Sequence, residues 1–203
     1  MIYFFDNYEQ NSLENLTEFL PEKRREKCLR LRQKRDRENC IAVYFILKQI
    51  LKEKGIDFSD FDTDENGKPF IKNCPLYFNI SHCRLGAVVA VSESPVGVDV
   101  QDIGDYNKKV AERVCTEEEL LLINNSPDKA KAFTRLWTLK EAAAKYDGKG
   151  IQILKNFSFE NGEKFFEKYG RKFTAFEKKN LFISVCGDEK FSDIIEIKNL
   201  EVF

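Results

Sequence analysis

The strongest helix signal in the chain contains the nine residues Trp137-Thr138-Leu139-Lys140-Glu141-Ala142-Ala143-Ala144-Lys145. Alanine and leucine favour a helical interior. Residues four apart lie on the same face of a helix, so Trp137, Glu141 and Lys145 should form one line of ring, carboxylate and ammonium. Taken alone, Glu141 and Lys145 also fit an ordinary exposed ion pair, which contributes only about 0.2–0.5 kcal/mol.

Turn-forming and capping residues delimit this helix. Ser126 is placed to cap its N-terminus, with Pro127 as its first residue. Gly148 and Gly150 should end it. Further upstream, 116-TEEE-119 has the pattern of a capping box and predicts that another helix starts there.

Outside this helix, the chain alternates between strand and helix patterns. Strand patterns occur at the N-terminus and at 76–80, 86–92, 96–103, 152–159, 172–178, 181–186 and 194–203, and helix patterns at 12–20, 21–37 and 36–54. The order of strand, helices and strands occurs twice. We therefore predict an α+β fold with antiparallel sheets, divided into halves at 1–98 and 99–203, with the chemistry in the cleft between them.

The composition is that of a globular protein, because 42% of the 203 residues are hydrophobic and 33% are charged. No apolar run is long enough to span a bilayer, and the start lacks the basic region of a signal peptide. Six cysteines without a C-x-x-C pair, together with a single histidine, argue against a zinc site and a disulfide framework. We expect reduced thiols and a cytoplasmic location.

The segment 21–37 is strongly basic although the whole chain has a formal net charge of −1. It contains nine Lys or Arg residues and three Asp or Glu residues, among them Lys23 and Lys27. Such a segment indicates an anionic partner, or else a solvated helix face.

Valines alternate with Gly97, Asp99 and Gln101 along the strand at 96–101. The valines should share the buried face, leaving two oxygen donors about 6.6 Å apart on the other. A carboxylate and an amide on a rigid strand suit Mg²⁺, and Gly97 would leave room for a ligand to approach. The alternative is that Asp99 lies on an exposed strand face without a ligand.

Three further polar residues lie where loops carry function. Ser81 and His82 end the apolar strand at 76–80, and Lys68 precedes Pro69, which stiffens its loop. These side chains could contact phosphate, although a turn histidine and a surface lysine are the ordinary interpretations. A Ser/His hydrolase is disfavoured because adjacent strand residues point apart and no G-x-S-x-G motif is present.

Four segments in this order resemble the 4′-phosphopantetheinyl transferases of the Sfp type. They are Gly67-Lys68-Pro69, 78-FNISH-82, 96-VGVDVQ-101 and 137-WTLKEAAAK-145, the last being similar to the family's W-x-x-K-E-A-x-x-K variant. The basic stretch 21-PEKRREKC-28 also resembles the family's N-terminal helix. The resemblance covers nearly all of the chain up to about residue 160.

The resemblance implies two similar α+β halves related by a pseudo-twofold, with coenzyme A (CoA) bound between them. It implies an Mg²⁺-dependent holo-carrier-protein synthase, which transfers the phosphopantetheine arm of CoA to a serine of an apo acyl- or peptidyl-carrier protein and releases adenosine 3′,5′-bisphosphate. It also implies a monomer that acts on neither nucleic acid nor membrane. The rival hypothesis is a non-catalytic protein that binds CoA or another polyanion through segment 21–37.

The resemblance also implies roles for individual residues. Asp99 and Glu141 would ligate Mg²⁺, and Glu141 would also take the serine proton. Lys145 would neutralise the pyrophosphate. The remaining CoA-binding roles would fall to Lys68, Ser81, His82, Lys23 and Lys27, and Glu119 corresponds to another acidic position of the site.

The chain departs from the family pattern at two positions. Gln101 stands where many members have glutamate, so it would reach Mg²⁺ directly or through water. Asn39 stands where an arginine is common, and no CoA contact is expected there.

Overall fold

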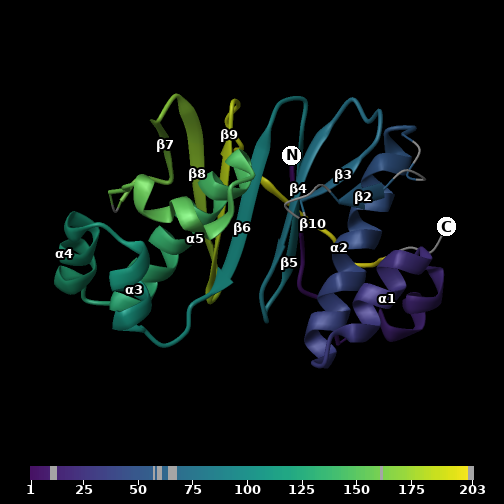
Figure 1. The fold of residues 1–203 in the computed structure, drawn as a ribbon, viewed down its shortest axis with the longest axis horizontal. Coiled ribbons are helices and arrows are strands. Elements are labelled where there is room, and N and C mark those ends of the chain that lie inside the picture. The colour runs from purple at the N-terminus through teal and green to yellow at the C-terminus, as the bar shows by residue number, and fades with distance from the viewer. Residues whose placement is uncertain (10–12, 57, 59–60, 64–67, 161, 201–203) are drawn as a thin grey trace.

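The computed structural model describes residues 1–203 except 10–12, 57, 59–60, 64–67, 161 and 201–203. Two four-stranded sheets form the centre of the molecule. A long helix packs on each sheet, α2 (Lys34–Glu53) in the first half and α5 (Lys129–Asp147) in the second (Figure 1). The prediction of an α+β fold with antiparallel-dominated sheets is confirmed.

The first half is built on a sheet with the strand order β10-β1-β5-β4. Its strands are β1 (Ile2–Phe5), β4 (Tyr77–His82), β5 (Ala87–Ser92) and, from the C-terminal end of the chain, β10 (Ile194–Glu196). Its other elements are the 3₁₀ helix η1 (Leu13–Phe19), α1 (Glu22–Arg30) and the hairpin of β2 (Phe61–Thr63) and β3 (Pro69–Ile71). The basic segment therefore spans α1 and the start of α2.

The second half is built on a sheet with the strand order β6-β9-β8-β7. Its strands are β6 (Val96–Asp102), β7 (Phe165–Lys168), β8 (Arg171–Lys178) and β9 (Leu181–Gly187). Its other helices are α3 (Lys108–Val114), α4 (Glu117–Asn125) and the 3₁₀ helix η2 (Gly150–Asn156). The capping box predicted at the start of α4 is present, with Thr116 and Glu119 bonded reciprocally to each other's backbone.

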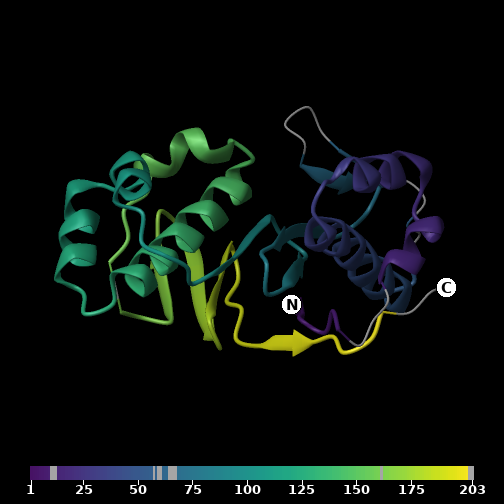
Figure 2. The same ribbon diagram turned by 90° about the horizontal axis from the view of Figure 1, so that it is seen from below.

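The same pairing order occurs in both sheets. In each half the first strand pairs antiparallel with the last strand of a hairpin, which gives β1-β5-β4 and β6-β9-β8. This repeat agrees with the expectation of two similar halves. The boundary at residue 98 stays a prediction; β6 runs through it, and β10 crosses back to pair with β1 (Figure 2).

Three apolar clusters hold these layers together. One lies under α2, a second lies between α5 and the second sheet, and the third joins the two sheets. Val96, Val98 and Val100 belong to the third cluster and are at most 1% exposed, as their alternation predicted. Because these valines face the first sheet, the opposite face of β6 is left for α5.

Gly97 lies on that opposite face, but it leaves room for a helix instead of a ligand. A Cβ atom on Gly97 would lie 2.1 Å from the Ala142 carbonyl oxygen and 2.4 Å from the Tyr146 nitrogen. The expectation that this glycine admits a ligand is therefore wrong. Its function is to let α5 pack directly onto β6.

Two local predictions around α5 are also wrong. Asp128, whose side chain accepts a hydrogen bond from the Lys131 amide, caps the helix, and Ser126 instead ends α4. The strand expected at 152–159 is largely the 3₁₀ helix η2, which follows Gly148 and Gly150, both at φ 68°. The C-terminal strand covers only 194–196 of the predicted 194–203, of which 201–203 lie outside the described residues.

Candidate active site

Asp99, Ser81 and Lys145 form one hydrogen-bonded cluster at the contact between the two halves. The Lys145 ammonium donates to Asp99 Oδ1 at 2.7 Å and to Ser81 Oγ at 2.8 Å. Ser81 Oγ also donates to the same Asp99 oxygen at 2.8 Å. The cluster thus joins β4 of the first half to β6 and α5 of the second, and it brings together three of the residues expected in the site.

The course of the backbone explains why these side chains meet. Asp99 follows Gly97 by two residues and so points to the same side of β6, toward α5. Close packing at Gly97 brings the last turns of α5 against this strand. The side-chain oxygen of Asn79 on β4 accepts a hydrogen bond from the Val98 amide at 3.1 Å, which fixes β4 beside β6. Asn79 is buried and therefore has a structural role that its motif alone did not reveal.

Glu141 lies one helical turn before Lys145 and carries a strongly perturbed carboxyl. Burial raises the pKa of Glu141 to about 7, the charge of Asp99 adds to this rise, and the charge of Lys145 opposes it. Two carboxyl groups that disfavour each other's ionisation form a site that gains from a positive charge between them. Glu141 is therefore protonated at mildly acidic pH and poised to exchange a proton near neutrality.

The donor set fits a magnesium ion. Mg²⁺ needs only one or two protein carboxylates when substrate phosphate and water complete its shell. Asp99 and Glu141 supply two carboxylates, and Gln101, half-buried on the same side of β6 as Asp99, supplies an amide oxygen nearby. Among the described residues, no group of three or more His, Cys, Asp or Glu side chains could hold a metal, so a ligand would have to complete the shell.

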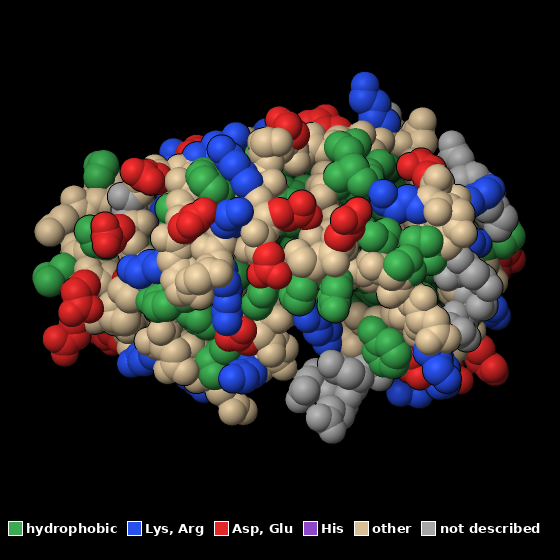
Figure 3. All heavy atoms as spheres, turned by 90° about the horizontal axis from the view of Figure 1, so that it is seen from above, with side chains coloured by type: hydrophobic (Ala, Val, Ile, Leu, Met, Phe, Trp, Pro, Cys, Tyr) green, Lys and Arg blue, Asp and Glu red, His purple; other side chains and the backbone are tan. Residues whose placement is uncertain are grey.

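A cleft of about 280 Å³ lies beside this cluster and is lined by several cations. Lys27 and Arg24 reach it from α1, Lys68 from the start of β3, and Lys145 from α5. Lys68 also donates to the Lys145 carbonyl oxygen at 3.1 Å, linking the first half to the end of α5. Figure 3 shows Lys and Arg side chains in the hollow where the two halves meet. Such a lining suits a ligand with several phosphates.

Two residues of the basic segment exchange importance relative to the sequence prediction. Lys23 is exposed and is not among the described residues that line the cleft, whereas Arg24 lines it and is only 9% exposed. Arg24 lies three residues before Lys27, so the two side chains share a helix face. That spacing is the signal in the sequence that could have identified Arg24.

His82 ends β4, directly after Ser81. Its imidazole is accessible to water, but the surrounding protein and the charge of Lys145 lower its pKa below the ordinary value of 6.5. The charge of Asp36 opposes this shift. His82 is thus mostly neutral at pH 7 in the free chain, and an adjacent phosphate would favour its protonation.

Glu119 does not join the Asp99 cluster, which corrects its expected place among the acidic site residues. It is completely buried and forms an ion pair of 2.7 Å with Lys140, the residue before Glu141. Trp137 is half-buried against the core under α5, with its ring centroid 5.9 Å from that of Phe133. The expected packing of Trp137 beside the site residues agrees with this position.

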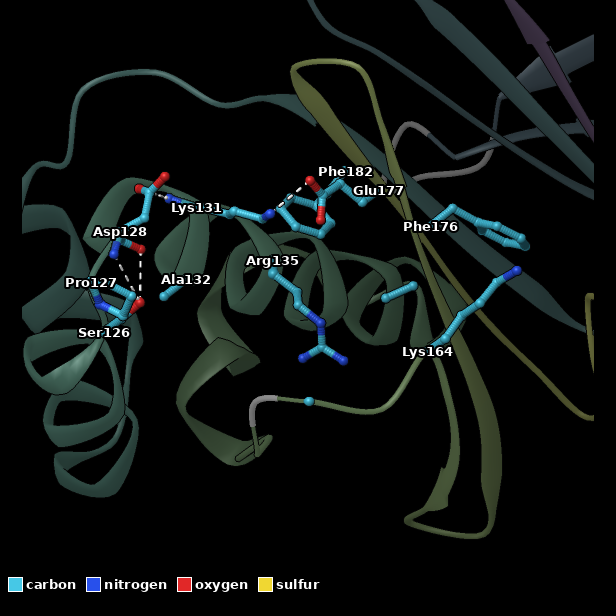
Figure 4. Close-up of a pocket in the computed structure, with 12 residues that line it drawn as sticks. Ser126, Pro127, Asp128, Lys131, Ala132, Arg135, Lys164, Phe176, Glu177 and Phe182 are labelled. Carbon is cyan, nitrogen blue, oxygen red and sulfur yellow. Dashed lines mark hydrogen bonds and ion pairs between the residues drawn. The ribbon is translucent and has the colours of Figure 1, made fainter.

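A larger cavity of about 800 Å³ lies near the other end of α5. Figure 4 shows Lys131 reaching across it to Glu177, an ion pair of 2.7 Å, while Arg135 points to the chain below. Arg135 donates to the carbonyl oxygens of Glu160 and Glu163, and Lys164 lies over the Phe176 ring. Because its charged groups are engaged with one another, this cavity lacks the open chemistry of the smaller cleft.

Comparisons with known proteins point to one family. The family described as "4'-phosphopantetheinyl transferase superfamily" matches residues 95–193. The chain is 30% identical to "4'-phosphopantetheinyl transferase Sfp" of Bacillus subtilis over 164 residues, which cover 77% of this chain and 73% of the relative. It is 37% identical to "4'-phosphopantetheinyl transferase gsp" of Aneurinibacillus migulanus over 95 residues, 46% of this chain and 40% of the relative.

Among solved structures, the holo-[acyl-carrier-protein] synthase of Thermotoga maritima aligns with a TM-score of 0.34 and 22% identity, covering 46% of this chain and 62% of that one. The relationship to the Bacillus subtilis protein spans both halves and is the finding that establishes the family. The resemblance expected from the sequence motifs is thereby confirmed, and the chain belongs to the 4′-phosphopantetheinyl transferases of the Sfp type.

Proposed function

We propose that this transferase moves the phosphopantetheine arm of CoA to a serine of an apo carrier protein at the Asp99 cluster. The observation that carries the proposal is the convergence of Asp99, Ser81 and Lys145 from three elements beside a cleft lined by further cations. Phosphoryl transfer requires mainly positioning and neutralisation of charge, and the site supplies both. A non-catalytic polyanion-binding protein is not favoured, because the comparisons all lead to transferases.

The cations of the cleft would hold the phosphates of CoA. Lys27 and Lys68, with Arg24, line its wall, and Lys145 connects the wall to Asp99. Ser81 and His82 stand at the end of β4, where a hydroxyl and an imidazole can donate to phosphate oxygens. In this arrangement Lys145 lies against the pyrophosphate and stabilises the negative charge that develops on the leaving oxygen.

Asp99 and Glu141 would hold the metal, with Gln101 contributing directly or through water. When bound, Mg²⁺ supplies neutralisation of the pyrophosphate and a template for its orientation. Glu141 has a second task, because its pKa of about 7 suits a group that accepts a proton near neutral pH. We assign Glu141, directly or through a water molecule, as the acceptor of the proton from the carrier serine.

The reaction balances with these groups. The serine oxygen forms a bond to the phosphorus that carries the pantetheine arm, while the bond from that phosphorus to the bridging oxygen breaks. Adenosine 3′,5′-bisphosphate leaves with the electron pair, and the serine proton passes to Glu141. Lys145 is placed to stabilise the departing phosphate.

The test uses the purified chain, CoA, Mg²⁺ and a panel of apo acyl- and peptidyl-carrier proteins. Intact-mass spectrometry should show one phosphopantetheine group added to at least one carrier, and EDTA should stop the addition until Mg²⁺ is restored. No addition to any carrier would refute the transfer. Addition that continues undiminished in EDTA would refute the metal assignment alone.

Two expectations accompany the proposal. In the part of the chain that the structure describes, no helix is long and apolar enough to cross a membrane. A cytoplasmic location and a monomeric state remain predictions, which fractionation of cells and light scattering of the purified chain would test. The comparison of rates across the carrier panel would identify the preferred pathway.

A further inference from the structure

The pair of Glu119 and Lys140 is buried completely, with both side chains 0% exposed and their charged atoms 2.7 Å apart. Glu119 comes from the first turn of α4, and Lys140 comes from the middle of α5. Burying two charges is costly, and an ion pair of this kind is weak evidence for added stability. The contacts of the pair therefore need another explanation.

The two side chains bind the backbone at several separate places. The Lys140 ammonium donates to the carbonyl oxygens of Leu154, at 3.0 Å, and Phe157. The Glu119 carboxylate accepts from the amide of Thr116 at 2.8 Å and from the amide of Phe159 at 2.9 Å. One ion pair thus fixes the start of α4, the middle of α5 and the chain from η2 to residue 159 relative to one another.

These fixed segments lead directly to the site. Gly148 and Gly150, which line the cleft, connect α5 to η2 in the left-handed conformation. A Cβ atom on either glycine would meet nothing within 4 Å, so the turn itself has little packing to fix its position. Its path is set by α5 on one side and by η2 on the other, and Lys140 bonds to η2 from α5.

The pair also sets the rotation of α5. Consecutive residues on a helix are about 100° apart, so the direction of Lys140 determines the direction of Glu141. With Lys140 directed into the closed pocket between α4 and η2, Glu141 is turned toward Asp99, whose charge raises its pKa. A different rotation would separate the two carboxylates.

We propose that Glu119 and Lys140 are positioning residues of the transferase. The pair fixes the rotation of α5 and the return of the chain through η2, and so places Glu141 and the glycine wall of the cleft. Neither side chain touches CoA or the carrier. The inference rests on the proposed function for its kinetic consequence, whereas its structural consequence can be measured without substrate.

The experiment compares Glu119→Gln, Lys140→Met and the double variant with a matched control, Thr138→Val. Thr138 is also fully buried on α5, and its hydroxyl lies 2.7 Å from that of Ser184 on β9, away from η2. Thermal unfolding followed by circular dichroism chooses a temperature at which every variant compared is folded. At that temperature, kcat and the KM for CoA are measured, together with hydrogen exchange of the backbone amides of residues 148–159.

The pair variants should lose kcat by about 10²-fold, the effect of misplacing a reacting group by about 1 Å. Their amides at 148–159 should exchange faster than those of the wild type, also without CoA. Thr138→Val should keep kcat and exchange in this segment close to wild type even where its melting temperature falls. If Lys140→Met does not fold, Glu119→Gln, which keeps the shape of the side chain, decides the question.

Wild-type kcat and exchange in folded pair variants would overturn the proposal. A wild-type chain that transfers nothing would instead refute the proposed function, and the exchange data would still decide whether the pair orders the segment.

Discussion

Two lysine–carboxylate pairs on one helix have the same length and different surroundings. Lys140 and Glu119 are 2.7 Å apart with both side chains 0% exposed, and Lys145 and Asp99 are 2.7 Å apart with side chains 28% and 8% exposed. The closed pair uses its remaining hydrogen bonds on the backbone of α4 and η2. The open pair shares Asp99 with a serine and borders a cleft.

The comparison teaches that the pairing of charges does not identify an active site. What distinguishes the open pair is a second carboxylate beside it, that of Glu141, whose pKa is raised to about 7, and a cleft lined by further cations. A ligand can replace solvent there, whereas the closed pair has no room for one. The predictions below separate the two environments.

The largest effect should come from the two carboxylates of the open site. Glu141→Gln and Asp99→Ala should each lower the rate of transfer by at least about 10²–10⁴-fold, because one removes the proton acceptor and both remove a metal ligand. Intact-mass measurements of carrier modification over time report the rate. Wild-type rates in either folded variant would contradict the assignment.

Removing the lysine of each pair should separate chemistry from stability. Lys145→Met should lower kcat strongly but change the free energy of unfolding by about 1 kcal/mol or less, as for other solvent-accessible pairs. Lys140→Met should lower the free energy of unfolding by about 3–5 kcal/mol, because it leaves Glu119 as an unpaired buried charge. Denaturant unfolding and kinetics of both variants test this, and equal loss of stability would remove the distinction.

The stability of the metal-free chain should depend on pH through Glu141. Its pKa of about 7 lies above the unfolded value of 4.5, so between these values the folded chain binds more protons, and its stability falls as pH rises. Glu141→Gln cannot ionise and escapes this loss. Its melting temperature relative to wild type should therefore increase from pH 5 to pH 8, and a difference that does not change with pH would show that Glu141 is not perturbed.

A smaller effect should distinguish two lysines of α1. Lys27→Ala should raise the KM for CoA several-fold by removing one cation from the cleft, a loss of about 1 kcal/mol. Lys23→Ala is the matched control, since it removes the same charge from the same helix at an exposed position outside the described lining. Equal KM changes would indicate a general electrostatic effect of the basic segment.

The sequence predicted those features that local patterns determine. The alternating valines of β6 placed Asp99 on the correct face, and the capping box located the start of α4. The family resemblance placed Asp99, Lys145 and Ser81 in one site, and the structure brings them together. Spacing alone could not do so, because these residues belong to β6, α5 and β4.

The predictions that failed depend on tertiary contacts. Gly97 is explained only when α5 is seen against β6, and Glu119 only when Lys140 is found beside it. The apolar residues after Gly150 suggested a strand, but their carbonyl groups turn toward Lys140 in η2 and the segment after it. The cap of α5 was misplaced because Ser126 and Asp128 are both good capping residues, and the local fold selected Asp128.

The central claim, that a metal and CoA share the open site, is tested most directly by Mn²⁺ binding with and without CoA, measured by electron paramagnetic resonance. Wild-type chain and the Lys23→Ala control should bind one Mn²⁺ tightly when CoA is present and weakly when it is absent, since phosphate completes the shell. Glu141→Gln and Asp99→Ala should lose the CoA-dependent binding. Unchanged Mn²⁺ binding in both variants would contradict the account.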